Sequence, residues 1–193
     1  KITSKTKNAD FYLVYTLTFL ALSLFLFLQF YLNGKSLVWK HDGVPQHLNS
    51  LSYYGEYLRG ILYSLFVEHK CKIPMWDMHI GYGSDILTTL HYYVIGVPLT
   101  LLSVLVKPEH TEKLYEFLIF LRIYLAGITF SRYAFYHKNS KQAVFMGTMI
   151  YIFAGWTIYA SMKHPYFSNP MIYLPLILMG IDKIYRKEKP YIF

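Results

Sequence analysis

A run of 24 residues without a charged side chain, from Phe11 to Gly34, constrains this chain more than any other feature of its sequence. As an α-helix the run is about 36 Å long, and the hydrocarbon core of a bilayer is about 30 Å thick. A cleaved signal peptide is the alternative, but its apolar region is normally about 7–15 residues and ends in a small-residue cleavage site. This run is longer and ends in Gln29-Phe30-Tyr31-Leu32-Asn33-Gly34. We therefore predict a transmembrane anchor over residues 11–33.

The composition agrees with a membrane protein and excludes several other classes. Hydrophobic residues make up 54% of the chain and charged residues 16%, against about 25% charged in soluble proteins. Such hydrophobicity excludes intrinsic disorder, and 11 glycines with one cysteine exclude collagen-like and disulfide-rich folds. The net charge of +8 would suggest nucleic acid in a soluble protein. Here the basic residues lie between apolar runs, so we expect a lipid bilayer as partner and no nucleic acid.

Four further apolar runs define the predicted topology: Ile86–Val106, Tyr115–Tyr136, Gln142–Met162 and Pro170–Tyr185. The first contains Gly96 and Pro98, so its helix should be broken. Lys1, Lys5 and Lys7 place the N-terminus in the cytoplasm by the positive-inside rule.

If Ile86–Val106 lies outside as an interfacial or re-entrant segment, every short basic loop is cytoplasmic. If it spans, the cluster Arg186-Lys187-Glu188-Lys189 lies outside. We favour the first arrangement. It predicts an all-α polytopic protein with an external segment over residues 34–114 and four spans, at residues 11–33, 115–136, 142–162 and 170–185.

The external segment should contain an amphipathic helix that lies parallel to the membrane on its surface or packs against other helices. Apolar residues recur at helical spacing from Leu48 to Phe66, and Pro45 suits a first helical turn. Ile73–Asp85 should be a loop because it contains Pro74, Gly81 and Gly83.

Carboxylates, histidines and aromatic residues gather in this segment. They include His41, Asp42, Gln46, His47, Trp76, Asp77, Asp85 and His91. Carboxylates serve as general bases or hold divalent metals, and aromatic faces suit sugar rings. The ordinary alternatives are that Asp42 caps the helix at Pro45, that Asp85 holds the Gly-x-Gly turn, and that Asp77 is structural. The histidines match no standard zinc motif.

The order of short motifs resembles the bacterial YfhO family of membrane proteins from about Phe11 to Lys187. The matching pieces are Gly34-Lys35-Ser36-Leu37-Val38-Trp39, Asp42-Gly43 with Gln46-His47, Tyr53-Tyr54-Gly55, Ile73-Pro74-Met75-Trp76-Asp77, Gly81-Tyr82-Gly83-Ser84-Asp85, Tyr92-Tyr93 with Pro98, Ala154-Gly155-Trp156, His164-Pro165-Tyr166-Phe167-Ser168-Asn169-Pro170, and Leu174-Pro175-Leu176. Family members are much longer. Together with the ending Tyr191-Ile192-Phe193, this leads us to expect an N-terminal piece that is inactive alone.

The resemblance implies a GT-C-type glycosyltransferase of the bacterial plasma membrane. Such an enzyme moves a hexose or N-acetylhexosamine from a polyprenyl-phosphate donor to a cell-envelope polymer such as lipoteichoic acid. An acidic residue soon after the first span is typical of the class, and Asp42 stands at that position.

The candidate roles follow from that chemistry. Asp42 is the expected base, and Asp85 is a second acid or, with Asp42, a ligand for Mg²⁺ or Mn²⁺. Substrate contacts are expected from His41, Gln46, Trp76, Asp77 and His91. Arg122, inside an apolar run, and His164 are candidates for the lipid phosphate, although Arg122 near a span end would snorkel.

Two other functional classes remain open. A transporter or flippase of a lipid-linked sugar would use the same aromatic and basic residues to line its path, but it would need no base at Asp42. A broken helix near Gly96 and Pro98 is compatible with transport. A non-catalytic assembly scaffold would need none of Asp42, Asp85 and Arg122.

Overall fold

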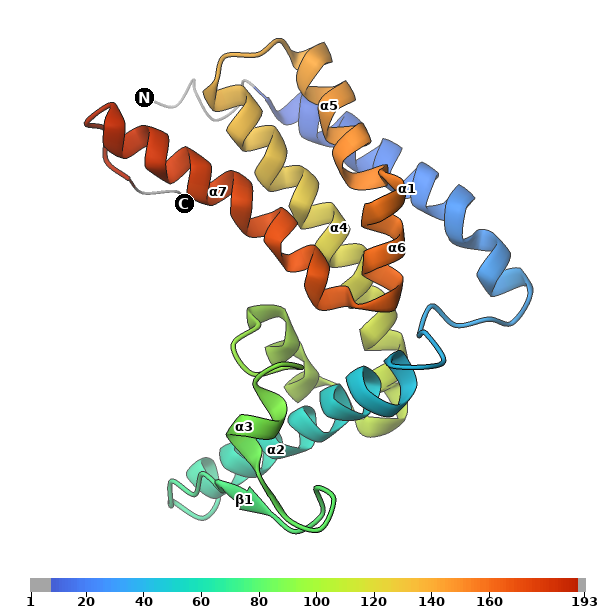
Figure 1. Cartoon of the computed structure of the whole chain (residues 1–193), viewed down its shortest axis with the longest axis vertical. Coiled ribbons are helices and arrows are strands. Elements are labelled where there is room, and N and C mark those ends of the chain that lie inside the picture. The colour runs from blue at the N-terminus through green and yellow to red at the C-terminus, as the bar shows by residue number, and fades with distance from the viewer. Residues whose placement is uncertain (1–7, 191–193) are drawn as a thin grey trace. The chain divides into compact units, whose positions relative to one another are not determined.

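The computed structural model describes residues 8–190, in two compact units. One unit combines the chain up to Leu37 with the chain from Ile119 onwards, and the other is Val38–Leu118. Helices dominate both, as predicted (Figure 1). Lys1, Lys5 and Lys7, on which the predicted N-terminal orientation rests, and the Tyr191-Ile192-Phe193 ending lie outside the described residues.

The first unit is built from five helices and one 3₁₀ turn. They are α1 (Ala9–Leu32), α4 (Thr111–Tyr136), which begins in the other unit, α5 (Lys141–Phe153), α6 (Gly155–Lys163), η4 (Pro165–Ser168) and α7 (Asn169–Tyr185).

Two stretches of helix are long and apolar enough to cross a bilayer within residues 8–190. They are Ala9–Leu32, with mean hydropathy 2.2, and Pro108–Tyr136, with mean hydropathy 1.5. Where a span is predicted over residues 142–162, the structure has α5 and α6, bent by 42° at the break at Ala154. The two together have the length and composition of one span. Helix α7 forms where the fourth span was predicted, but its 17 residues extend only about 26 Å.

Every fourth residue of helix α1 is buried against the rest of the unit. Phe11, Tyr15, Phe19 and Phe27 are buried, whereas Leu13 and the other leucines of the opposite face are exposed, as suits contact with lipid.

Against α4, the Tyr15 hydroxyl donates to the carbonyl of Tyr124 at 2.7 Å. A Cβ atom at Gly127 would overlap the Tyr15 ring, so this glycine permits the close approach of the two helices.

Helix α7 contains Pro175, which has no N–H to donate to the carbonyl of Met171, four residues earlier. The Tyr151 hydroxyl of α5 donates to that carbonyl instead, at 3.0 Å. At the bend between α5 and α6, the Thr157 hydroxyl likewise donates to the carbonyl of Tyr151, at 2.9 Å. In an apolar medium each such carbonyl needs a partner, and neighbouring hydroxyls supply it.

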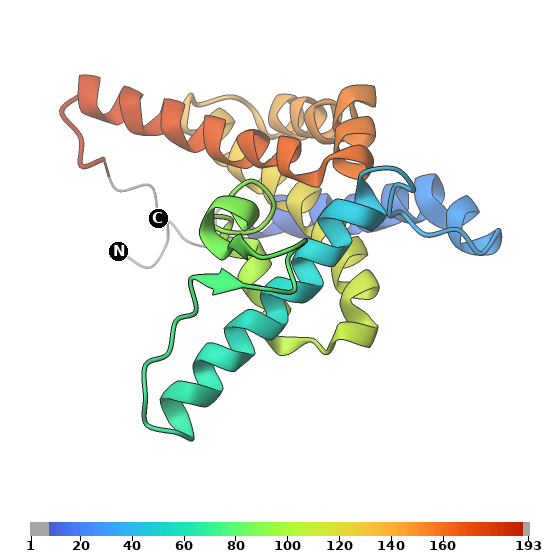
Figure 2. The same cartoon turned by 60° about the horizontal axis from the view of Figure 1, so that its bottom comes forward.

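The second unit surrounds one long helix. Its elements are a π-helical turn η1 (Gly43–Leu48), α2 (Asn49–Phe66), β1 (Trp76–Asp77), β2 (Ser84–Asp85), α3 (Ile86–Leu90) and the 3₁₀ segments η2 (Pro98–Leu105) and η3 (Pro108–His110). The two strands pair antiparallel, with Trp76 opposite Asp85. Figure 2 shows the chain returning beside α2 from its C-terminal end to β1. The Tyr57 hydroxyl fixes this return by donating to the carbonyl of Pro74 at 3.0 Å.

Helix α2 is the predicted amphipathic helix, and it packs closely on η2. A Cβ atom at Gly55 would lie 2.6 Å from the carbonyl oxygen of Ser103. The Arg59 guanidinium donates to the same oxygen at 3.0 Å and to the carbonyl of Val106 at 2.6 Å. These bonds hold the C-terminal end of η2 against α2.

The run Ile86–Val106 forms no spanning helix. It breaks after α3, turns at Gly96 with φ +87°, and resumes as η2. The predicted break at Gly96 and Pro98 is therefore confirmed, and the interfacial or re-entrant position of this run stays a prediction.

Candidate functional site

Asp42 stands at the junction where the extended loop after α1 enters the π-helical turn. Its backbone carbonyl accepts from the N–H of Gln46 at 3.2 Å and of His47 at 3.1 Å, which starts the turn. Its side chain makes no capping bond to that turn. The alternative reading of Asp42 as a side-chain cap is therefore wrong.

The Asp42 carboxylate is held by a short chain of hydrogen bonds. The Gln46 amide donates to Oδ1 of Asp42 at 3.2 Å, and the Tyr93 hydroxyl donates to the Gln46 carbonyl oxygen at 3.1 Å. His47 is buried, with its ring 5.6 Å from that of Tyr93. The exposed His41 packs edge-on to Trp39, with ring centres 5.4 Å apart. The fold thus brings Tyr93 from a distant segment to Gln46 and His47, beside the Asp42 carboxylate.

Asp85 caps helix α3. Its Oδ1 accepts from the N–H of Thr88 at 2.7 Å, with the backbone extended as a cap requires. His91, at the far end of the same short helix, is exposed and contacts the carbonyl of Thr88 through Nδ1 at 2.6 Å. The turn-and-cap interpretation accounts for what Asp85 does in this structure, and its catalytic role stays a prediction.

Within residues 8–190, no group of three or more His, Cys, Asp or Glu side chains is placed to hold a metal ion. Asp42 and Asp85 each make the separate local bonds just described, and a Mg²⁺ or Mn²⁺ ion held by the two stays a prediction.

Asp77 is the most strongly hydrogen-bonded carboxylate of the second unit. The Tyr53 hydroxyl donates to Oδ2 at 2.5 Å, and the backbone N–H and ring Nδ1 of His79 contact Oδ1, each at 2.8 Å. These bonds, that from Tyr53 first, lower the pKa of Asp77 to about 2. Burial and the bond to Asp77 raise the pKa of Tyr53. Asp77 is therefore ionised at neutral pH and is a weak base.

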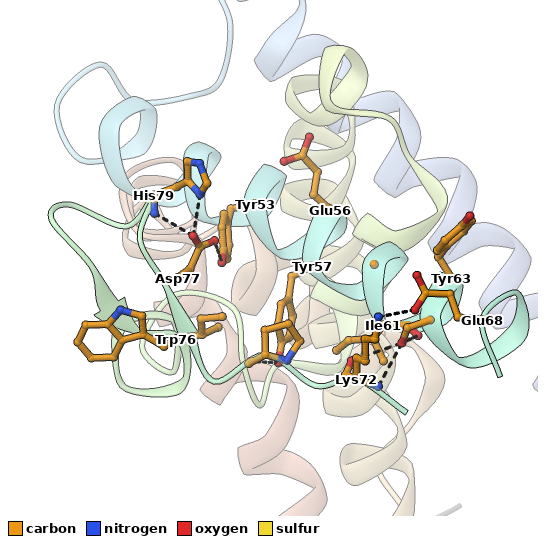
Figure 3. Close-up of a pocket in the computed structure, with 14 residues that line it drawn as sticks. Tyr53, Glu56, Tyr57, Ile61, Tyr63, Glu68, Lys72, Trp76, Asp77 and His79 are labelled. Atoms are coloured by element: carbon orange, nitrogen blue, oxygen red, sulfur yellow. Dashed lines mark hydrogen bonds and ion pairs between the residues drawn. The ribbon is translucent and has the colours of Figure 1, made fainter. Parts of the chain in front are cut away.

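A cavity of about 560 Å³ opens beside this group, between α2 and the returning chain. In Figure 3, Tyr53, Asp77 and His79 point toward one another on one side of it, and Glu68 and Lys72 meet on the other, with Tyr57 between them. Nζ of Lys72 lies 2.6 Å from Oε2 of Glu68. Trp76 and Glu56 also line the cavity.

Arg122 belongs to the first unit, where it is buried within the apolar helix α4. Its Nε donates to the Asn169 side-chain oxygen at 3.0 Å, and its guanidinium lies 5.5 Å from the ring centre of Tyr166. His164 packs against Phe167, with ring centres 5.1 Å apart. At 2% exposure Arg122 does not snorkel, so that alternative is wrong. A contact with a lipid phosphate stays a prediction for both residues.

Sequence reasoning missed Tyr53, Tyr57, His79 and Tyr93 as site residues. Tyr53 and Tyr57 carried a usable signal, because residues four apart share a helix face. Tyr93 belongs to the Tyr92-Tyr93 motif, but no local pattern predicts its contact with Gln46, 47 residues away.

Comparison with known proteins gives one family. The sequence model described as bacterial membrane protein YfhO matches residues 14–193. Neither a curated protein nor a solved structure matches the chain.

Proposed function

We propose that this chain, which belongs to the YfhO family of bacterial membrane proteins, is part of a glycosyltransferase of the GT-C type. The enzyme would move a hexose or N-acetylhexosamine from a polyprenyl-phosphate donor to a cell-envelope polymer such as lipoteichoic acid. The reaction would take place on the outer face of the plasma membrane, with the N-terminus in the cytoplasm.

One observation carries the proposal: a carboxylate just after the first apolar helix is held by a side-chain network and is not used as a helix cap. Gln46 binds one oxygen of Asp42, Oδ1, at 3.2 Å, and Tyr93 fixes the Gln46 amide in turn. A group held in this way is oriented before the substrate arrives, which is what a general base needs.

The chemistry requires a base and a stabilised leaving group. An acceptor hydroxyl attacks the anomeric carbon and forms the new C–O bond. The bond from that carbon to the phosphate oxygen breaks, and polyprenyl phosphate leaves with the electron pair. Asp42 takes the hydroxyl proton as the attack proceeds. The aromatic and imidazole rings of Trp39 and His41, which pack edge to face and precede Asp42 in the sequence, suit the faces and hydroxyls of a sugar.

The test measures transfer from a labelled polyprenyl-phosphate hexose to envelope polymer in membranes that contain the full-length protein. Asp42→Asn keeps the shape of the side chain but removes the base, so we expect a loss of about 100-fold or more. Glu109→Gln, an exposed carboxylate-to-amide change in the same unit, is the matched control and should keep wild-type transfer. Expression of all variants is compared by immunoblot.

The other outcomes are informative. Unchanged transfer in Asp42→Asn would move the base to Asp85 or Asp77. Label that crosses the bilayer without reaching polymer, in wild type and variant alike, would support the transporter or flippase function instead.

A further inference from the structure

The cavity beside α2 lies apart from the Asp42 network and has no part in the proton transfer just described. Its walls combine the phenol rings of Tyr53 and Tyr57, the indole of Trp76 and the carboxylates of Asp77 and Glu56. Its volume of about 560 Å³ falls in the range of about 300–1,000 Å³ typical of small-molecule sites. The mixture of flat aromatic faces and fixed hydrogen-bonding groups indicates a ligand that has both apolar faces and hydroxyls.

We propose that this cavity binds a neutral glycosyl unit, and that it is the subsite for the acceptor polymer. The second half of the proposal rests on the proposed transferase function, whereas the binding of a neutral sugar ring does not.

The charges of the cavity argue against an anionic ligand. Lys72 is a cation of the lining, and it is paired with Glu68 at 2.6 Å. Asp77 is ionised, and Glu56 adds a further carboxylate at the exposed surface of α2. A phosphate group placed here would meet uncompensated negative charge, which is costly. The phosphates of a polymer or of the lipid donor should therefore lie outside this cavity.

Two of the carboxylates that line the cavity are already held by hydrogen bonds or an ion pair. Both oxygens of Asp77 accept hydrogen bonds, from Tyr53 and from His79. Glu68 is neutralised by Lys72. Carboxylates held in this way retain lone pairs that accept from hydroxyl donors, which a neutral sugar supplies.

The aromatic walls are held in place before any ligand binds. The Tyr57 hydroxyl donates to the Pro74 carbonyl at 3.0 Å, and the Trp76 indole N–H points at the sulfur of Met78 at 3.3 Å. Trp76 is nevertheless 60% exposed, which is unusual for tryptophan and leaves it accessible for stacking. Fixed rings lower the entropic cost of binding.

Binding is tested by saturation-transfer NMR on the full-length protein in nanodiscs. The probes are methyl α-D-glucopyranoside and methyl N-acetyl-β-D-glucosaminide as neutral sugars, choline as a cation and glycerol 3-phosphate as an anion. We expect transfer to at least one neutral sugar and none to the two ions. Trp76→Ala should weaken sugar binding by about tenfold, the upper end for one aromatic contact. Trp76→Phe should restore part of it.

The matched control is Tyr82→Ala. Tyr82 is a fully exposed aromatic residue in the turn between β1 and β2, and it does not line the cavity. This variant should bind like wild type. The proposal is overturned if neither sugar gives saturation transfer, if Trp76→Ala and Tyr82→Ala behave alike, or if choline or glycerol 3-phosphate binds in place of the sugars.

Kinetics separate this proposal from the proposed function. If the protein is a transferase, Trp76→Ala should raise KM for the acceptor and leave KM for the lipid donor unchanged, whereas Asp42→Asn lowers kcat. If the wild-type protein binds sugar but transfers none, the proposed transferase function is contradicted, and the proposed sugar-binding site is still supported. Transfer with an acceptor KM that Trp76→Ala does not change would contradict the acceptor subsite.

Discussion

The Asp77 carboxylate is fixed by donors from two directions, and this arrangement shapes one side of the cavity. Tyr53 holds one oxygen and His79 holds the other. Because the pKa of Asp77 in the folded protein, about 2, lies below its ordinary value of 3.8, these bonds stabilise the fold above pH 3.8. That contribution is lost as the pH falls from 3.8 towards 2.

We predict that Tyr53→Phe raises the pKa of Asp77 towards 3.8, since the bond from Tyr53 is the largest cause of its depression. Carbon-detected NMR of the Asp77 carboxyl, titrated between pH 2 and 6, measures this directly. Tyr57→Phe is the control, because its hydroxyl donates to the Pro74 carbonyl and not to Asp77. Equal pKa values of Asp77 in wild type and Tyr53→Phe would contradict the role assigned to Tyr53.

At the level of single residues, the sequence indicated which kinds of polar side chain the site contains, but it predicted only some of the contacts between them. Asp42 and Gln46 are four apart, and their contact follows from one helical turn. The contacts of Gln46 with Tyr93 and of Arg122 with Asn169 join residues 47 apart. Such pairs depend on tertiary packing, which no local pattern encodes.

Among the elements, the packing of α2 on η2 leaves no room for a methyl group at Gly55. Gly55→Ala would place a carbon 2.6 Å from the Ser103 carbonyl oxygen, which is backbone and cannot move aside easily. We expect a loss of about 1–3 kcal/mol, as for other overpacked sites. Thermal unfolding in detergent, followed by circular dichroism, measures it.

Gly60→Ala is a control on the same helix, five residues on. A Cβ atom there meets nothing within 4 Å, so alanine should stabilise α2 by about 0.5–1 kcal/mol. Two variants that shift the melting temperature by the same amount and in the same direction would show that η2 does not pack on Gly55.

Element boundaries were predictable where apolar periodicity was uninterrupted. The residues of α1, α2 and α7 follow from the runs that predicted them. The break at Ala154 was not predicted, because Ala154-Gly155 contains no proline and the run Gln142–Met162 contains no charge. The break leaves the Tyr151 carbonyl without its helical N–H partner. The Thr157 hydroxyl donates to this carbonyl instead and so stabilises the bend.

For the whole molecule, the proposed topology can be tested with a residue the chain already carries. Cys71 is its single cysteine, and it is exposed in the unit proposed to be external. We predict that a membrane-impermeant maleimide labels Cys71 in intact cells. Labelling is read by mass shift on a gel.

The matching control moves the thiol to the other proposed side. In a Cys71→Ser background, Lys138→Cys places it in the exposed turn between α4 and α5. This variant should be labelled only after the membrane is permeabilised. Labelling of Lys138→Cys in intact cells, with protection of Cys71, would reverse the orientation.

The hydrogen bond from the Tyr151 hydroxyl to the Met171 carbonyl also limits which residues can stand at these positions in related sequences. Once proline occupies position 175, the carbonyl of Met171 depends on a hydroxyl from another helix. Phenylalanine at position 151 would fill the same space but leave that carbonyl without a donor in the hydrocarbon. We therefore expect the hydroxyl at position 151 and the proline at position 175 to occur together, although they lie on different helices.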